Sequence, residues 1–316
     1  MPGERMKILV TGGAGYIGSH LVPFLLGQGH SVTVVDSFAY GQSSLLSEVI
    51  NRRLELIKCD VRDFKKWATP LGAADVVIPL AAIVGAPACQ QRPAEAASIN
   101  LTATLELFQR VSSGQLIIMP TTNSAYGSGR DGEVFTEQSR LRPISQYARE
   151  KVEVEENLMQ RDLSVSLRLA TVFGMSQRMR TDLLVNNFVL RALTDKVLPI
   201  FEGHFVRNYI HVRDVVNAID LAIQSPSDFA GGVFNVGLSQ ANVTKLALAR
   251  MVADRVGGVS VVEIDNQKDG DQRNYIVSNE KIEAMGFKAE ISLEDGIDEL
   301  ARGLPLLASP PHVNLR

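Results

Sequence analysis

A glycine-rich turn near the amino terminus constrains the fold of this chain more than any other feature. Its sequence, TGGAGYIG at residues 11–18, follows the apolar run Lys7–Thr11 and precedes a helical pattern. In such a turn Gly12 permits a tight bend, Gly15 lets backbone approach a pyrophosphate, and Gly18 lets the helix pack closely on the strand. The helix N-terminus then offers N–H groups to phosphates. The turn therefore predicts a strand–turn–helix unit that binds a dinucleotide.

Short apolar runs alternate with helical patterns through the first half of the chain. The expected strands after the first are Val32–Asp36, Leu54–Lys58, Val76–Leu80, Gln115–Met119 and Val165–Leu169. The expected helices are 18–27, Leu45–Asn51, Phe64–Ala68, Ala94–Ser112 and Gln146–Gln160. Near-continuous apolar strands separated by helices are typical of a parallel sheet covered on both faces. The pattern predicts an α/β fold, a doubly wound parallel sheet of the Rossmann type with right-handed crossovers.

The alternation changes after Gly174. We expect helices at Asp182–Asp195, Val212–Gln224, Val243–Val256, Asn279–Met285 and Leu293–Ala301, and strands at Val233–Val236 and Val259–Ile264. We therefore divide the chain into a dinucleotide-binding domain, a smaller mixed α/β substrate-binding lobe and a tail. The domain is residues 1–173 with 206–240 returning to it, the lobe is residues 174–205 and 241–304, and the tail is residues 305–316.

Composition excludes several classes of protein. Hydrophobic residues make up 45% of the 316, enough for a full core, and the net charge of −3 gives no sign of a nucleic-acid or membrane surface. The two cysteines, Cys59 and Cys89, are too few for a disulfide framework, and no Cys/His cluster suggests a metal site. We expect a cytoplasmic protein with no metal, no nucleic-acid partner and no membrane partner.

An acidic residue follows the glycine turn at the spacing expected for a dinucleotide site. Asp36 ends the second expected strand, 18 residues after Gly18, and no arginine directly follows it. A carboxylate there accepts hydrogen bonds from a ribose 2′-hydroxyl and repels a 2′-phosphate. The sequence thus favours NAD over NADP.

Three residues have the chemistry of a hydroxyl-oxidising site. Tyr147 and Lys151 lie one turn apart on a predicted helix, so the lysine can lower the pKa of the phenol, which is ordinarily about 10. Such a tyrosine can accept the proton of a sugar hydroxyl while hydride leaves to a nicotinamide. Thr122, at the end of the fifth strand, is the expected third member, with Thr121 and Ser124 as alternatives. The YxxxK spacing alone is also common on surface helices.

Together these motifs resemble the extended short-chain dehydrogenase/reductase family, the NAD-dependent nucleotide-sugar epimerases and dehydratases. The resemblance spans Lys7 to about Ala301. It implies cofactor contacts from the glycine turn and the strand ends: Gly12, Gly15, Tyr16, Ile17, Gly18, Asp36, Asp60, Val61, Leu80, Ala81, Ala82, Asn100, Tyr147 and Lys151. It implies substrate contacts from Thr122, Asn123, Thr171, Arg178, Arg180, Asn187, Arg207 and Asp271, with arginines on the diphosphate. By the same resemblance, the helices 100–112 and 146–160 pair across a twofold axis in a homodimer.

Departures from the family pattern narrow the expected reaction. The 4,6-dehydratases carry Asp-Glu after the catalytic hydroxyl residue, whereas this chain has Asn123 and Ser124. Many epimerases have Asn where Thr171 stands, and many relatives have His where Pro79 stands. We therefore expect a 4-epimerase or 4-dehydrogenase of a nucleotide-diphosphate sugar and no dehydratase. Several further segments look like a bacterial subgroup that includes GDP-heptose 4-dehydrogenases.

The sequence also allows a second interpretation of the function. A non-catalytic NAD-binding redox sensor of the same fold is the alternative, although the presence of both Tyr147 and Lys151 argues against it. His211 lies in an apolar stretch and is expected to be structural, whereas His204 lies on a glycine-flanked loop and is expected to be exposed. Neither histidine is assigned an acid or base role.

Overall fold

The computed structural model describes residues 5–129, 132–264 and 274–307, and it confirms the doubly wound sheet. Seven strands pair in the order β12-β7-β5-β4-β1-β2-β3, and every neighbouring pair is parallel. They are β1 (Lys7–Thr11), β2 (Ser31–Asp36), β3 (Leu54–Lys58), β4 (Val76–Pro79), β5 (Leu116–Thr122), β7 (Ser164–Leu169) and β12 (Gly232–Val236). The chain order reverses between β1 and β4, and a crevice forms beyond the carboxyl ends of strands at such a point.

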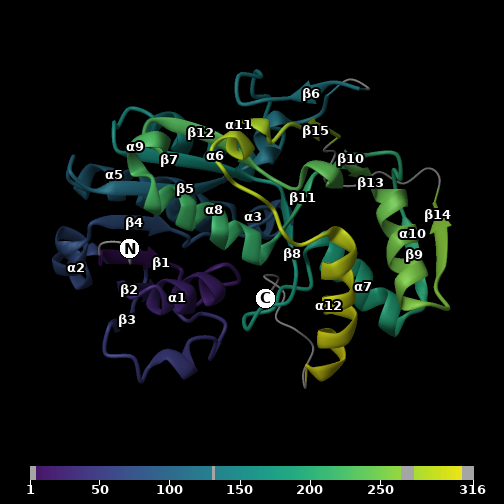
Figure 1. The fold of residues 1–316 in the computed structure, drawn as a ribbon, viewed down its shortest axis with the longest axis horizontal. Helices are drawn as coiled ribbons and strands as arrows, with labels where there is room; N and C mark the ends of the chain where they lie inside the picture. Colours follow the sequence, from purple (N-terminus) through teal and green to yellow (C-terminus); the bar gives the residue numbers. More distant parts are fainter. Residues whose placement is uncertain (1–4, 130–131, 265–273, 308–316) are drawn as a thin grey trace.

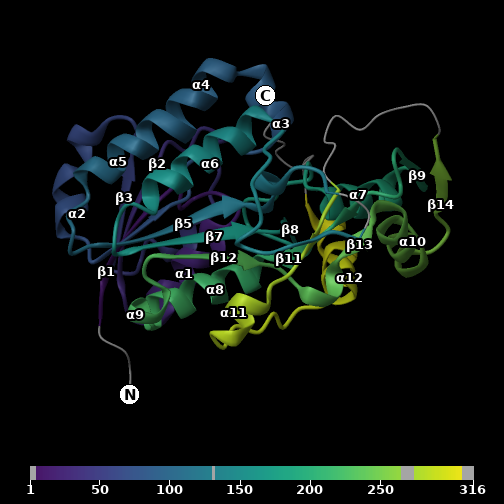
Figure 2. The same ribbon diagram turned by 90° about the horizontal axis from the view of Figure 1, so that it is seen from above.

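Helices cover both faces of the sheet (Figures 1 and 2). One layer contains α1 (Gly18–Gly27), α8 (Val212–Gln224), α9 (Pro226–Phe229) and α11 (Glu280–Ala284). The other contains α2 (Ala68–Ala73), α3 (Ala86–Gln91), α4 (Pro93–Ala97), α5 (Thr104–Arg110) and α6 (Gln146–Leu158). Side chains alternate between the layers: Ile8 and Val10 pack in the core that includes α1 and α8, and Leu9 packs in the core that includes α5 and α6. Both faces of β1 are therefore buried.

Beyond one end of the sheet, three helices and short two-stranded pairings enclose a separate apolar cluster (Figure 1). The helices are α7 (Leu184–Thr194), α10 (Lys245–Val256) and α12 (Leu293–Gly303). The paired strands around it are β8 (Thr171–Phe173) with β11 (Tyr209–His211), β9 (Val197–Ile200) with β14 (Ser260–Glu263), and β10 (Val206–Arg207) with β13 (Val243–Thr244). A further pairing, β6 (Val134–Phe135) with β15 (Ile276–Val277), packs instead with Tyr126 and Tyr275 in a smaller cluster. The domain boundaries inferred from the sequence stay a prediction.

Several element predictions were wrong in detail. The single helix expected at 94–112 is divided into α4, a π-helix at Ser98–Ala103 and α5, and α3 was missed. Pro93 begins α4, where its missing N–H costs nothing, and Asn100 in the π-turn bonds to the backbone of Ile83 on another segment. The strand expected at 115–119 runs on to Thr122.

Shorter elements also differ from the prediction. Residues 45–51 form only the 3₁₀ turn Leu46–Glu48, and 64–68 form the 3₁₀ turn Phe64–Lys66 followed by α2. Further 3₁₀ turns lie at Asn123–Tyr126, Ser239–Ala241 and Leu304–Leu306, the last within the expected tail. Residues 243 and 244 are a strand rather than the start of a helix.

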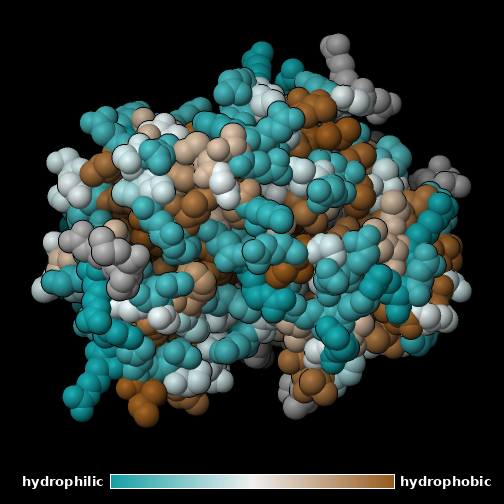
Figure 3. Space-filling model, viewed as in Figure 1, coloured by the Kyte–Doolittle hydropathy of each residue, from teal (hydrophilic) through white to brown (hydrophobic). Residues whose placement is uncertain are grey.

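Hydrophilic and hydrophobic residues are interspersed over the face seen in Figure 3. Among the residues that the structure describes, Ile50 has the most exposed large hydrophobic side chain, with 88% of its surface accessible. Among the described helices, none combines the length and the apolar character that crossing a bilayer requires.

Candidate active site

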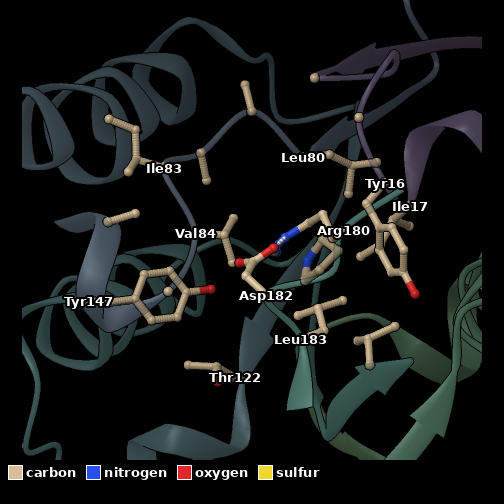
Figure 4. Close-up of a pocket in the computed structure, with 18 of the residues that line it drawn as sticks. Tyr16, Ile17, Leu80, Ile83, Val84, Thr122, Tyr147, Arg180, Asp182 and Leu183 are labelled. Atoms are coloured by element: carbon tan, nitrogen blue, oxygen red, sulfur yellow. Dashed lines mark hydrogen bonds and ion pairs between the residues drawn. The ribbon is translucent and has the colours of Figure 1, made fainter. Parts of the chain in front are cut away.

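A cavity of about 970 Å³ lies where the glycine turn, the ends of β2, β4 and β5, and the segment after β8 converge. This volume is at the upper end of the range usual for ligand pockets. Most of the predicted site residues line it: Gly12, Gly15, Tyr16, Ile17, Gly18, Asp36, Asp60, Val61, Leu80, Ala81, Ala82, Thr122, Tyr147, Lys151, Thr171, Arg178, Arg180, Asn187 and Arg207. In Figure 4, Tyr147 stands on one side, Tyr16 and Ile17 stand on the other, and the ion pair of Arg180 with Asp182 lies between them.

The glycine turn has the shape of a phosphate cradle. Gly12 has a φ of +68°, and a Cβ there would lie 2.6 Å from the Ala81 nitrogen. A Cβ on Gly18 would collide with the backbone carbonyl of Gly13. Helix α1 starts at Gly18, and no side chain of the described residues caps it. The turn residues 15–18 line the cavity, so the N-terminus of α1 begins at its wall, which is the position that favours a bound pyrophosphate.

Asp36 is held at the end of β2 with its carboxylate at the cavity wall. Its Oδ2 accepts a hydrogen bond from the Ala14 N–H at 3.0 Å, and its Oδ1 accepts one from the Phe38 N–H at 2.8 Å. Burial raises the pKa of Asp36, and these two N–H groups together with the charge of Arg178 oppose that shift. The orientation suits a ribose hydroxyl, and the donors keep the carboxylate in place.

Helix α6 carries Tyr147 and Lys151 into the cavity. Ser145 caps the helix by accepting a hydrogen bond from the Ala148 N–H at 3.2 Å, so Tyr147 lies in the first turn. The Lys151 Nζ lies 6.0 Å from the centroid of the Tyr147 ring. Burial lowers the pKa of Lys151 to about 8, and the neighbouring Glu150 charge opposes that shift. Lys151 is therefore mostly protonated at neutral pH although only 5% of it is exposed.

The hydroxyl of Thr122 is engaged with the turn that follows β5. It accepts a hydrogen bond from the Ser124 N–H at 3.1 Å and donates one to the Ser124 Oγ at 3.0 Å. Ser124 lines the cavity beside it. The hydroxyl of Thr121 instead forms hydrogen bonds with Glu155 on α6 and Ser166 on β7. Of the three hydroxyl residues proposed from the sequence, Thr122 and Ser124 thus form one pair at the cavity.

Asn100 lies behind the cavity wall, on the π-helical turn Ser98–Ala103. Its Oδ1 accepts from the Ile83 N–H at 2.8 Å, and its Nδ2 donates to the Ile83 carbonyl at 3.0 Å and to Glu150 Oε2 at 3.1 Å. It is fully buried and does not line the cavity. The π-turn of its helix aims this amide at the loop after β4, so Asn100 supports that loop from behind.

Asn123 is also absent from the cavity lining, contrary to the prediction that it contacts substrate. The 3₁₀ turn after β5 buries its side chain, and within the described part of the chain its amide has no hydrogen-bond partner. Asp271, the remaining predicted substrate contact, lies outside the described residues.

The arginines predicted to meet phosphates occupy different parts of the cavity. Arg180 pairs with Asp182 at 2.5 Å. Arg207, on β10, is buried at the wall. The guanidinium carbon of Arg178 lies 4.1 Å from the centroid of the Tyr40 ring, and its charge opposes the rise that burial causes in the pKa of Asp36. No sequence motif marks Asp182 and Tyr40, which also line the cavity.

The histidines have the structural roles expected of them. His211 is fully buried, its Nδ1 accepts a hydrogen bond from the Arg213 N–H at 3.2 Å, and its ring meets Phe173 edge-on. It therefore caps α8. His204 is exposed.

This geometry combines a Rossmann-type sheet with a tyrosine–lysine pair that lines the same cavity as the glycine turn. The family model described as "NAD dependent epimerase/dehydratase family" matches residues 8–237, so the chain belongs to that family. NAD is accordingly its cofactor, and the glycine cradle and Asp36 fit it.

Relatives within the family differ in reaction. The chain is 27% identical over 305 residues to "Low-salt glycan biosynthesis protein Agl12" of Haloferax volcanii, covering 93% of this chain and 96% of that protein. A dTDP-glucose 4,6-dehydratase from Streptomyces venezuelae, solved with NAD and TYD bound, is 27% identical with a TM-score of 0.83, covering 95% and 97%. A UDP-glucose 4-epimerase from Thermotoga maritima, solved with UDP-glucose, is 28% identical with a TM-score of 0.80, covering 95% and 99%.

Proposed function

We propose that the protein oxidises C4 of the sugar in a nucleotide-diphosphate sugar, as a 4-epimerase or a 4-dehydrogenase. One observation carries this proposal: Tyr147, Lys151 and Thr122 line the same cavity as the glycine turn and Asp36. A phenol, an ammonium and a hydroxyl beside a nicotinamide site are the groups that alcohol oxidation requires.

NAD, when bound, supplies the hydride acceptor. Tyr147, as the phenolate, would take the proton of the sugar C4 hydroxyl and become the neutral phenol as the C4 hydride leaves. Forming a phenolate at pH 7 ordinarily costs about 4 kcal/mol, and a neighbouring cation reduces this cost. The Lys151 ammonium is the buried cation that does so. The Thr122 hydroxyl, paired with Ser124, holds the sugar oxygen and orients it toward Tyr147.

Binding of the sugar nucleotide is assigned to the far side of the cavity. Arg207 there suits a diphosphate, because a guanidinium is planar, always charged and able to donate two parallel hydrogen bonds. Thr171 and Asn187 line the same wall and supply polar contacts. If the keto sugar rotates before hydride returns, the product is the C4 epimer, and if it leaves, the reaction is a net oxidation.

Water elimination is not part of the proposal, although dehydratases are among the relatives. Dehydration needs an acid and a base beside the catalytic hydroxyl residue. At the two positions after Thr122 this chain has Asn123, which does not line the cavity, and Ser124, whose hydroxyl is not an acid or base at pH 7.

We also propose that two copies of the chain form a homodimer through the helical segments 100–112 and 146–160.

The test is incubation with NAD and a panel of UDP-, GDP- and dTDP-sugars. Absorbance of reduced nicotinamide reports net oxidation, and NMR of the sugar reports epimerisation. Tyr147→Phe should abolish turnover and leave NAD binding nearly intact. Tyr275→Phe is the matched control, because Tyr275 is buried in the cluster of Tyr126 and Phe135. Turnover by Tyr147→Phe at the wild-type rate would refute the role of the tyrosine, and NAD binding without turnover of any sugar would favour the redox-sensor alternative.

A further inference from the structure

The segment between β8 and α7 is fastened to the cofactor-binding turn. The Tyr16 hydroxyl donates to the Gly174 carbonyl at 2.6 Å, and burial raises the pKa of Tyr16, so this donor keeps its proton. The Ser176 Oγ donates to the Tyr16 carbonyl at 2.9 Å and lies 2.8 Å from the Ser19 Oγ. Residues 174–176 therefore pack against the glycine turn and the start of α1.

This anchoring brings Arg178 to the adenosine end of the cavity. Only 3% of Arg178 is exposed, and its guanidinium carbon lies 4.1 Å from the centroid of the Tyr40 ring. Tyr40 follows β2 on the same loop as Asp36, and both residues line the cavity with Arg178. A guanidinium stacked on an aromatic face directs its N–H groups into its own plane, toward oxygen atoms that lie at its edge.

We infer that Arg178, stacked on Tyr40, binds the adenosine ribose and diphosphate of NAD, opposite Asp36. The sequence-based assignment placed Arg178 on the sugar nucleotide instead. The position beside Asp36 favours the cofactor, because Asp36 is the residue that marks the adenosine ribose. The inference rests on NAD dependence and does not require that the proposed reaction be correct.

A consequence concerns the order of binding. Arg180 and Asp182 lie two and four residues beyond Arg178 and line the middle of the same cavity. Because Arg178, Arg180 and Asp182 lie within five consecutive residues, a cofactor that binds Arg178 also fixes the positions of the other two. NAD should therefore bind first and complete the wall on which the sugar nucleotide rests.

The test measures binding without turnover, by calorimetric titration of the full chain with NAD. Arg178→Ala should weaken NAD binding about 10-fold to 100-fold, the usual effect of losing charge-assisted hydrogen bonds. Tyr40→Leu, which removes the stacking face, should weaken it less, and Tyr40→Phe should bind as wild type. Arg191→Ala is the matched control, since Arg191 on α7 pairs with Asp195 at the surface.

A second titration separates cofactor from substrate binding. UDP and GDP are added to NAD-saturated protein, and their affinities should change less in Arg178→Ala than the affinity for NAD does. The inference is overturned if folded Arg178→Ala binds NAD as wild type, or if it loses UDP or GDP affinity instead. If Arg178→Ala does not fold, as judged by its thermal transition, Tyr40→Leu against Tyr40→Phe decides the question: equal NAD affinity in the two overturns it.

Discussion

Replacing Lys151 with methionine should stabilise the folded protein while abolishing turnover. Burial lowers the pKa of Lys151 from 10.5 to about 8, so its charge opposes folding. The gap between these values corresponds to about 3 kcal/mol at pH 7. Methionine fills a similar volume without a charge. The gain is an upper value, because the variant also loses the attraction between Lys151 and the buried Glu150.

The pH dependence of this gain identifies its cause. Between about pH 8 and pH 10.5 the unfolded wild-type chain binds more protons at this residue than the folded chain does. The wild-type protein therefore becomes more stable as pH rises through that window, and the advantage of Lys151→Met shrinks to about 1 kcal/mol at pH 9.5. Urea unfolding at pH 7 and pH 9.5, without NAD, measures both values.

A second buried lysine provides the control. Lys245 is 3% exposed, and its Nζ donates to the Phe201 carbonyl at 2.5 Å. Lys245→Met leaves that carbonyl without this donor and should destabilise the protein by about 1–3 kcal/mol. If Lys151→Met is less stable than wild type at pH 7, or gains equally at both pH values, the account of Lys151 is wrong.

Three further predictions follow from the same structure. Turnover should fall above about pH 8, where Lys151 loses its proton, and a pH–rate profile that stays flat to pH 10 would contradict this. Arg168→Met leaves the Glu155 carboxylate buried without its 2.5 Å ion pair, so the free energy of unfolding in urea should fall by about 3–5 kcal/mol. A fall of less than about 1 kcal/mol would refute the role of the pair. Gly18→Ala should lower both the thermal midpoint and NAD affinity because its Cβ meets the Gly13 carbonyl, whereas Gly27→Ala on the same helix has nothing within 4 Å and should do neither.

Features governed by local chemistry were predictable from the sequence. The strands Lys7–Thr11 and Leu54–Lys58 were placed with their correct bounds, because both are short runs between turn residues. The first is buried inside the sheet, whereas the second is the edge strand and is partly exposed. The glycine turn was placed correctly because its conformations and close backbone approaches tolerate only glycine. Most predicted site residues line one cavity because carboxyl ends of parallel strands meet at one edge.

The errors arise where distant contacts decide the structure. The π-turn that divides the helix expected at 94–112 is stabilised by Asn100 and Ile83, 17 residues apart. The segment that carries Arg178 is held by the Ser19–Ser176 hydrogen bond, which joins residues 157 apart in the sequence, so motif spacing alone could not say which part of the cavity Arg178 occupies. The direction of Asn123 follows from a 3₁₀ turn that motif spacing does not reveal. In each case the residue type was recognised, but its surroundings came from another part of the chain.

Helix α6 shows how the fold tolerates a destabilising catalytic residue. Its cavity side carries Tyr147 and Lys151, while two buried carboxylates fix the same helix to its neighbours. Glu150 accepts hydrogen bonds from Gln146 at 2.7 Å and from Asn100 at 3.1 Å, and Glu155 pairs with Arg168 on β7. These bonds hold the helix against the sheet and against the loop that follows β4. The hydrogen bonds and the ion pair of Glu150 and Glu155 thus offset the free energy lost by burying the Lys151 ammonium on the same helix. These contacts hold Tyr147 and Lys151 at the cofactor cleft and take no part in the chemistry.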